Sequence, residues 1–223
     1  GWVRVPAGTF LMGCVEADTS CLDNEHPRHE VTLSSFLIAK HEISQRQWEA
    51  VMGDKSWTFA GDDFPAGGVT FEDCTEFCDR TGLSIPTEAR WESASRARSD
   101  DDLSDAKTLS EVAWFNRNAG ATPRPVGRKS PNSFGLHDTH GNVWEWCMDE
   151  YQADFYSKSP RTNPIAGGSI SYIINNFTDV KSRRVLRGGS WYYYSLYVRV
   201  ANRLRYDPDI WYATFGFRCV SAR

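Results

Sequence analysis

The chain has 223 residues, of which 40% are hydrophobic and 13% aromatic, and its formal net charge is −4. This apolar content is enough for the core of one large domain or two small ones. The mixed charge argues against sequence-independent nucleic-acid binding, which needs a basic face, so we expect no nucleic-acid partner. No run approaches 18 apolar residues, and therefore no membrane-spanning helix is expected.

The first residues, Gly1-Trp2-Val3, lack the charged and apolar regions of a secretion leader. A chain whose leader had been removed would begin in the same way, so the sequence leaves the compartment open. The arginines, 19 against 6 lysines, are concentrated late in the chain. Arginine suits interface pairing and stacking on aromatic rings better than lysine does.

Six cysteines are too few for a disulfide scaffold at this length: Cys14, Cys21, Cys74, Cys78, Cys147 and Cys219. The spacing of Cys14 and Cys21 allows them to close a small loop. Cys78 and Cys219 can be a thiol pair, two separate buried thiols or a disulfide. No CxxC and no Cys/His cluster with zinc spacing is present, so a structural zinc site is not expected.

The first third of the chain has regular patterns. Residues 3–12 predict a strand with a turn, and residues 31–38 predict another strand. A short helix is expected to begin at Ser44, with Trp48 and Val51 on one face, and to end at Gly53.

Two further helices have recognisable starts. Thr70 begins a segment typical of a capping box, in which the Thr oxygen accepts from an orphan amide. That helix should run to about Thr81, with Gly82 just beyond its end. Residues 86–88 open a third helix, expected to extend to Ala97, where the acidic side chains of the first turn are read as a structural helix start.

From residue 103 onward the chain is rich in Gly, Pro, Asn, Ser and aromatic residues. We expect short strands and long ordered loops there, because tryptophan and phenylalanine recur throughout. No internal repeat and no Gly/Ser linker divides the sequence. The pattern favours a single α+β domain over residues 1–223 with little regular secondary structure.

Residues 135–146 combine oxygen donors with a turn. Asp138 and Glu145 are hard ligands, and Gly141 allows a turn that can aim carbonyls inward, a mixture that suits calcium. The alternative is a turn in which Asp138 caps backbone amides and Glu145 pairs with an arginine. His137 and His140 lack an obvious third ligand for a transition metal.

Residues 187–199, with the sequence RGGSWYYYSLYVR, are the most unusual stretch. Six of the nine tyrosines lie between Tyr192 and Tyr212. Tyrosine offers a large contact area, few rotors and one polar tip, which makes it frequent in binding surfaces. The stretch therefore predicts a recognition surface.

Taken together, these segments resemble the sulfatase-modifying, formylglycine-generating-enzyme family. The blocks that carry the resemblance follow one another over nearly the whole chain: residues 6–13, 25–27, 69–73, 85–89, 135–146, 187–191 and 216–219. The resemblance implies a C-type-lectin-like fold. It also implies a calcium site at Asp138, Gly141, Val143 and Glu145, and a disulfide between Cys78 and Cys219. The family's second disulfide has no counterpart, because its positions are Ser95 and Arg203 here.

The sequence departs from the family at the catalytic positions. The enzymes hold copper with two cysteines just after RGGS, and those positions are Tyr193 and Val198 here. A phenol and an isopropyl group cannot replace the soft thiolate pair that binds Cu(I). We therefore expect no copper and no formylglycine-generating activity.

A non-enzymatic branch of the family, the variable proteins of diversity-generating retroelements, fits this departure. Their C-terminal segment is diversified through adenines, which restricts it to residues with codons ending in a pyrimidine. From Ser182 to Arg223 there is no Lys, Glu, Gln or Met, whereas the preceding 181 residues contain 24 of them. The resemblance suggests a bacterial or phage origin, with a surface or secreted location if a leader was removed.

The leading interpretation is a non-enzymatic binder of an unidentified macromolecule, expected to be a protein. Its variable segment spans residues 187–215, and the predicted ligand-binding residues are Tyr192, Tyr193, Tyr194, Leu196, Tyr197, Tyr206, Asp207, Ile210, Trp211, Tyr212, Ala213 and Thr214. The alternative is an enzyme of the family with non-copper oxidase or tailoring chemistry, for which His137, His140 and Tyr193 are the candidate groups. An open aromatic surface favours the binder, and a deep pocket with perturbed acids favours the enzyme.

Overall fold

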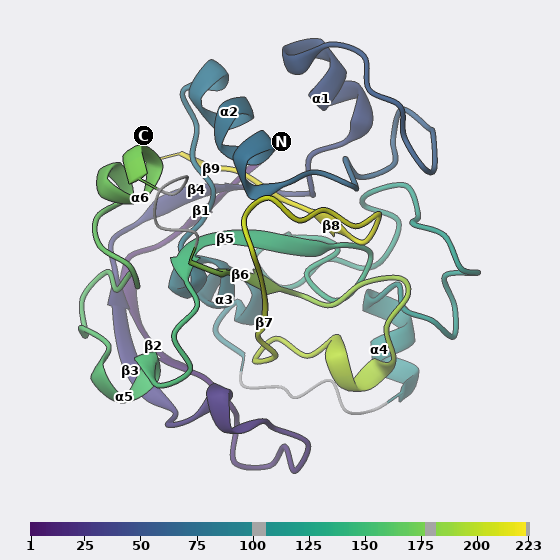
Figure 1. The fold of residues 1–223 in the computed structure, drawn as a ribbon. Helices are drawn as coiled ribbons and strands as arrows, with labels where there is room; N and C mark the ends of the chain where they lie inside the picture. Colours follow the sequence, from purple (N-terminus) through teal and green to yellow (C-terminus); the bar gives the residue numbers. More distant parts are fainter. Residues whose placement is uncertain (100–105, 177–181, 222–223) are drawn as a thin grey trace.

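The computed structural model describes residues 1–99, 106–176 and 182–221. Short strands and helices are joined by long loops, as expected for an α+β fold with little regular structure (Figure 1). No helix in these ranges is long and apolar enough to span a bilayer. The strands are β1 Trp2–Val5, β2 Gly8–Met12, β3 His29–Leu33, β4 Phe36–Ala39, β5 Trp144–Glu150, β6 Arg184–Arg187, β7 Leu204–Tyr206, β8 Phe215–Gly216 and β9 Val220–Ser221. The helices are η1 Asp23–Glu25, α1 Gln45–Met52, α2 Phe71–Thr81, α3 Glu88–Arg96, α4 Ala106–Val112, α5 Phe155–Lys158, α6 Ile170–Asn176 and η2 Ser195–Tyr197.

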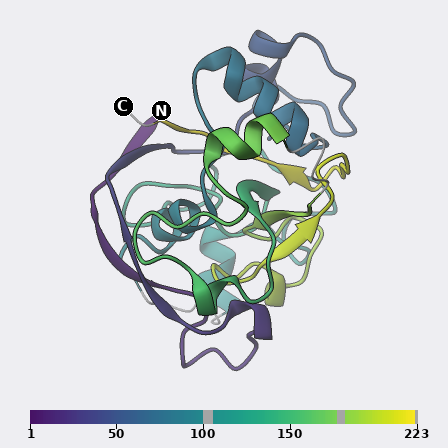
Figure 2. The same cartoon turned by 60° about the vertical axis from the view of Figure 1, so that its left-hand side comes forward.

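The two ends of the described chain meet in one sheet. Strand β4 pairs antiparallel with β1 on one side and with β9 on the other. Ile38 of β4 therefore faces both Val3 and Val220 in register. In Figure 2 the purple strands of the N-terminal region run along one side of the molecule. Strands β2 and β3 form a separate antiparallel pair. The expected strands at 3–12 and 31–38 are thus each divided in two, and their halves belong to different sheets.

A four-stranded sheet, in the order β7-β6-β5-β8, carries most of the C-terminal third. Its central pair β5 and β6 is antiparallel, with Trp146 opposite Leu186, whereas β8 joins β5 in parallel. Strand β7 pairs with β6 at the far edge. This sheet positions the ends of the variable segment, because β6 leads into residues 187–203 and β7 and β8 bracket residues 207–214.

The three early helices begin and end as expected. Ser44 and Thr70 both make complete capping boxes, and Gly82 ends α2 in the left-handed conformation. Thr87 caps α3 through the backbone N–H of Arg90, and α3 ends at Arg96. Side-chain oxygens thus satisfy the orphan amides of the first turn, and so a local sequence pattern is enough to fix these helix starts.

Aromatic rings fill the core between the four-stranded sheet and the helices α1 and α2. Phe77 stacks on Trp48 at 5.8 Å between ring centroids, and Phe217 meets both rings edge-on. Trp146 packs against Phe215 at 5.5 Å, and its indole N–H donates to the Val69 carbonyl. The tryptophans of residues 135–146 therefore form core, which explains why this loop-rich half is ordered.

The cysteine pairing differs from the pairing that the family resemblance implies. Cys14 and Cys21 form a disulfide that closes a small loop, one of the arrangements that their spacing allows. The predicted Cys78–Cys219 disulfide is not formed: both are free buried thiols, and their sulfurs are 3.8 Å apart, well beyond the roughly 2.05 Å of an S–S bond. The hydrogen bond with Cys78, and then burial, raises the pKa of the Cys219 thiol well above its usual range.

Candidate functional site: an aromatic face on a buried frame

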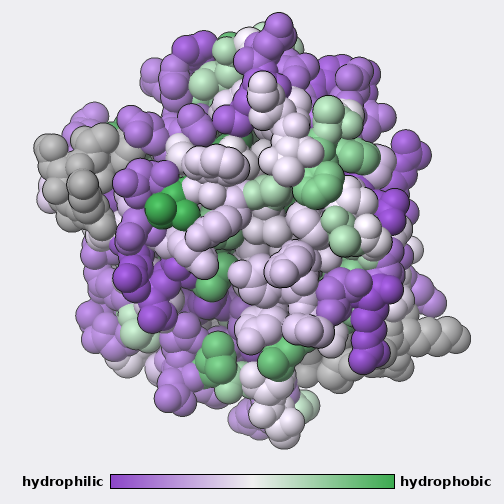
Figure 3. All heavy atoms as spheres, turned by 45° about the vertical axis from the view of Figure 1, so that its right-hand side comes forward, coloured by the Kyte–Doolittle hydropathy of each residue, from purple (hydrophilic) through white to green (hydrophobic). Residues whose placement is uncertain are grey.

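The twelve predicted ligand-binding residues form an accessible face. All of them lie in the described part of the chain and none is buried. Tyr192 and Tyr194 are each 67% exposed, and Trp211 is 57% exposed. Figure 3 views this side of the molecule, where pale and green residues gather at the centre and deep purple lies mostly toward the margins. The exposed members are Tyr192, Tyr194, Leu196, Asp207, Trp211 and Tyr212, and the half-buried members are Tyr193, Tyr197, Tyr206, Ile210, Ala213 and Thr214.

The half-buried tyrosines anchor this face to the core. Tyr193 meets Trp144 edge-on at 5.6 Å and Tyr197 at 5.5 Å. On the neighbouring loop, Tyr206 packs against Phe215 at 4.9 Å and against Tyr212 at 5.5 Å. Burial, reinforced by the nearby phenols, raises the pKa of Tyr193. These contacts order the aromatic face before any ligand arrives.

Several residues next to these tyrosines in the chain point inward. Trp191, Val198 and Arg199 are buried, and so are Asn202 and Arg203. The glycines of RGGSW make this possible: Gly189 has a φ of +79°, and a Cβ there would lie 2.7 Å from the Tyr197 carbonyl oxygen. Only glycine, which has no Cβ, allows the backbone at residue 189 to lie so close to the backbone at Tyr197.

The two positions of the family's copper cysteines have no common role here. Val198 is fully buried and packs with Leu109, Ala113 and Phe115. Tyr193 belongs to the aromatic face. The side chains present therefore offer a hydrocarbon and a phenol, and no thiolate, where the enzymes hold copper.

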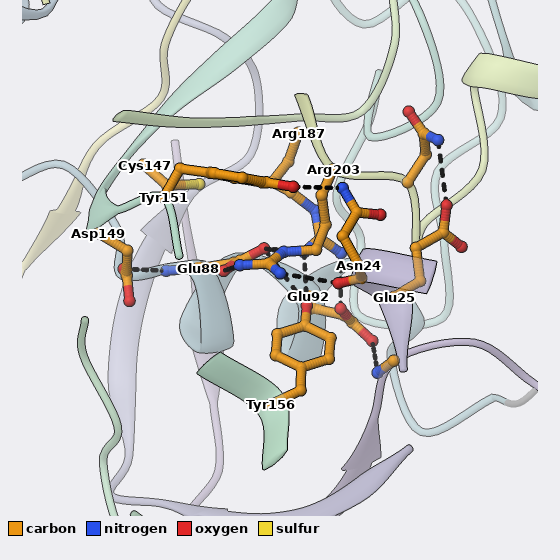
Figure 4. A network of polar contacts seen from close by, with 12 residues as sticks. Asn24, Glu25, Glu88, Glu92, Cys147, Asp149, Tyr151, Tyr156, Arg187 and Arg203 are labelled. Carbon is orange, nitrogen blue, oxygen red and sulfur yellow. Dashed lines mark hydrogen bonds and ion pairs between the residues drawn. The ribbon is translucent and has the colours of Figure 1, made fainter. Parts of the chain in front are cut away.

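Several of the late arginines lie in the interior, which the sequence did not indicate. Arg187 is fully buried and bonds to Glu88 and Glu92 of α3, each at 2.5 Å. Arg203 binds both carboxylate oxygens of Glu88, at 2.7 and 2.9 Å. Figure 4 shows these side chains converging with the Tyr156 hydroxyl. Burial by itself would raise the pKa of Glu88, but the charges of Arg203 and Arg187 outweigh it, and the pKa is lowered. The sequence signal that could have revealed this network is the i, i+4 spacing of Glu88 and Glu92, which places both carboxylates on one face of the helix.

Another buried arginine, Arg199, joins the variable segment to the N-terminal region. Arg199 donates to both oxygens of Glu25, at 2.7 and 2.8 Å, and to Asp18 at 2.6 Å. Its Nε–H donates to the Leu196 carbonyl at 2.9 Å, which ties the guanidinium to η2. Asn202 reaches Glu25 at 3.1 Å. The aromatic face therefore rests on ion pairs.

The predicted calcium ligands are all buried, around the turn at Asp138 and Gly141 and at the start of β5. Their two carboxylates have different partners. Asp138 has a φ of +58° and accepts from the Gly127 N–H through Oδ2, while its buried Oδ1 has no hydrogen-bond partner. Both oxygens of Glu145 bind Arg218, at 2.6 and 2.7 Å, and one also accepts from Trp91. These contacts match the alternative of a capping aspartate and a paired glutamate. The residues fit a cation at Asp138 and leave Glu145 already satisfied.

Several carboxylates are buried close to this turn. Glu42, Asp138 and Glu145 are all buried, and Arg218 is the cation that contacts Glu145 directly. Burial first, then the charges of Asp138 and Glu145, raises the pKa of Glu42 well above its usual range. Buried like charges are costly unless a proton or a cation compensates them.

The candidate groups of the enzyme interpretation do not converge. His137 bonds to the Lys129 carbonyl at 2.8 Å and lies beside the ring of His41. His140 lines a cavity of about 220 Å³ together with Ser95 and Asp138, and burial lowers its pKa to about 4. Among the described residues no hydrogen bond joins Tyr193 to either histidine.

A family model, the sulfatase-modifying factor enzyme 1-like domain, matches residues 1–223. The chain belongs to this family. It is 30% identical to the formylglycine-generating enzyme of Streptomyces coelicolor over 290 residues, covering 99% of this chain and 89% of that protein. It is 25% identical to the inactive C-alpha-formylglycine-generating enzyme 2 of Mus musculus, covering 99% and 85%. The sulfatase-modifying family thus contains both active and inactive relatives of this chain.

Solved structures of this fold family confirm the architecture. Treponema denticola variable protein 1 superposes with a TM-score of 0.81 and 25% identity, covering 100% of this chain and 95% of that one. PvdO from Pseudomonas aeruginosa has the same TM-score at 23% identity, with 98% and 93% covered, and shows the fold alone. The predicted C-type-lectin-like fold of the formylglycine-generating-enzyme type is confirmed, and so is the predicted resemblance to a variable protein.

Proposed function

We propose that this protein is a non-enzymatic ligand-binding protein of the sulfatase-modifying family. It displays the aromatic face of residues 192–214 to a macromolecular partner, which we infer to be a protein. One observation carries the proposal: in the variable segment the predicted ligand-binding residues are all accessible, while Val198, Arg199 and residues 201–203 of the same segment are buried. Aromatic side chains held in place by a rigid support lose little entropy on binding.

A display experiment tests this proposal. The twelve positions would be randomised with pyrimidine-ending codons, and the library would be selected against purified lysozyme as a test antigen. We expect folded binders that lose affinity for lysozyme when single aromatic residues at these positions are replaced by serine. A matched library randomised at the buried positions Trp191, Val198, Arg199, Asn202 and Arg203 should yield none. Failure of the first library, or equal success of the second, would overturn the proposal.

The absence of formylglycine-generating chemistry is part of the same proposal. The phenol of Tyr193 and the buried isopropyl group of Val198 support it. The purified protein would be incubated with copper, oxygen and a sulfatase-type peptide containing cysteine. We expect no aldehyde product, and the Streptomyces coelicolor relative serves as the positive control. Aldehyde formation at a comparable rate would show that the protein is an enzyme.

We also propose a calcium ion at Asp138, with carbonyl oxygens of Gly141 and Val143 as its remaining protein ligands and Glu145 as a nearby countercharge. The unpartnered Oδ1 of Asp138 and the excess of buried carboxylates support it. Calcium at 100 times its dissociation constant would stabilise the fold by about 2.7 kcal/mol. Thermal unfolding in calcium, magnesium and chelator tests this, and Asp138→Asn should remove the calcium response. Identical curves in calcium and chelator would exclude the site.

We further infer a surface or secreted location. The Cys14–Cys21 disulfide supports it, because such bonds persist in oxidising compartments.

A further inference from the structure

The closed loop near the N-terminus contains three soft or borderline metal ligands. The sulfurs of Cys14 and Cys21 and a ring nitrogen of His26 all lie within 4.8 Å of one another. The backbone produces this arrangement, because the Cys14 N–H donates to the Glu25 carbonyl at 3.0 Å and so brings His26 next to the first cysteine. The C-x6-C-x4-H spacing is not that of a zinc motif. The tertiary structure therefore assembles a Cys/His cluster that the sequence analysis did not expect.

The charges around the cluster favour a cation. The guanidinium of Arg199 lies 3.4 Å from the Cys21 sulfur, but it is bonded to the carboxylates of Asp18 and Glu25. The group of Arg199, Asp18 and Glu25 thus carries two carboxylates and one guanidinium. The positive guanidinium also stabilises a thiolate at Cys21, and thiolates are the metal-binding form.

Solvent can reach the cluster. Cys14 is buried, Cys21 is half-buried and His26 is exposed. No hydrogen bond from another described side chain occupies the His26 ring. A metal ion can therefore enter from the side of His26 and find two sulfurs and one nitrogen.

We propose that, after reduction of the Cys14–Cys21 bond, Cys14, Cys21 and His26 bind a zinc ion. A dithiol reductant supplies two electrons and two protons to the S–S bond and itself becomes a disulfide. Zinc(II) then displaces the two thiol protons, and no electron moves in this second step. Thiolate and imidazole ligands suit zinc, and water completes the four-coordinate site.

The site gives the loop two alternative crosslinks, a disulfide under oxidising conditions and a metal under reducing ones. Either crosslink holds Asp18 and the Ser20 carbonyl against Arg199, which in turn bonds to the Leu196 carbonyl of η2. Zinc would bring the two sulfurs to roughly 3.8 Å from each other, given Zn–S bonds of about 2.3 Å. The Cα atoms of the two cysteines, 6.1 Å apart, need to move little for this change.

Cobalt(II) spectroscopy on the full chain tests the proposal. The protein would be reduced with a phosphine, freed of excess reductant without oxygen, and titrated with cobalt. We expect a sulfur-to-cobalt charge-transfer band, its loss on adding zinc, and one zinc ion per chain. The oxidised protein should show no band. Absence of the band from the folded, reduced protein would overturn the proposal.

Variants separate this cluster from the buried thiols elsewhere in the chain. His26→Gln changes an exposed side chain, so the fold should survive, and circular dichroism would check it. We expect a loss of affinity of at least the 10- to 100-fold that is typical even for supporting groups of metal sites. His29→Gln, three residues further on, should leave affinity unchanged, and Cys21→Ser should abolish the band. A band that persists in Cys21→Ser, or an affinity equal to wild type in His26→Gln, would contradict the assignment.

Discussion

The variable segment contains two kinds of side chain, one buried and one exposed. Arg187, Arg199 and Arg203 are buried in ion pairs, whereas Tyr192 and Tyr194 are two-thirds exposed. In most proteins the aromatic residues would go inside and the charges outside. Here the charges are carried into the interior because each guanidinium meets a carboxylate from η1 or α3. The aromatic residues are left free for contact with a partner.

This contrast suggests that the fold depends on the buried ion pairs, whereas the exposed aromatic residues are available for binding. Buried ion pairs are weak evidence for net stability, but breaking one leaves an uncompensated charge and is strongly destabilising. Exposed aromatic residues contribute little to the fold and can be replaced.

The largest effect should come from Arg187→Met. It leaves Glu88 without one of its two arginines, and leaves Glu92 with Arg96 and the Gly13 N–H as partners. We expect the free energy of unfolding, measured by chemical denaturation, to fall by about 3–5 kcal/mol. The control Arg183→Met breaks the exposed pair with Asp207 and should cost about 1 kcal/mol or less. Equal losses in the two variants would contradict the contrast.

Acid should destabilise the fold through His140. Its folded pKa is lowered to about 4 from 6.5, so the unfolded state takes up its proton first as the pH falls. The stability from the neutral imidazole is complete above pH 6.5 and is lost between 6.5 and 4, by roughly 3 kcal/mol. In His140→Asn this part of the pH dependence should disappear, as followed by denaturation at several pH values. An unchanged slope would mean that His140 does not carry it.

The Cys14–Cys21 disulfide should have a moderate effect. Replacing both cysteines by serine removes a crosslink over a short loop, and we expect a loss of about 2–3 kcal/mol. The loop holds Asp18 against Arg199, so hydrogen exchange at η2 should also become faster. Wild type reduced in a metal-free buffer should behave like the double variant. If exchange at η2 is unaffected, the loop does not support the variable segment.

The smallest effect should come from the aromatic face itself. Tyr192→Ser combined with Tyr194→Ser should change stability by less than about 1 kcal/mol, because both rings are mostly exposed. Tyr193→Ser removes a ring that packs on Trp144 and should cost about 1–2 kcal/mol. Melting curves of the two variants measure the difference. A larger loss in the double variant would show that the exposed tyrosines are structural.

Local patterns in the sequence predicted much of the fold. The helix starts at Ser44, Thr70 and Thr87 follow from side-chain caps that act over three residues. The accessibility of the aromatic face followed from residue type and order, since the tyrosines between Tyr192 and Tyr212 exceed what a core would need. The catalytic departure at Tyr193 and Val198 is also a property of the sequence alone.

The pairing of distant residues was decided only by the tertiary structure. Arg187 meets Glu88 across 99 positions and Arg199 meets Glu25 across 174, and nothing local indicates which carboxylate each arginine will find. Cysteine pairing is equally non-local, which is why Cys78 and Cys219 come close without bonding while His26 joins Cys14 and Cys21. Caps and accessibility depend on near neighbours and composition, whereas ion pairs and metal clusters depend on how loops far apart in the chain pack together.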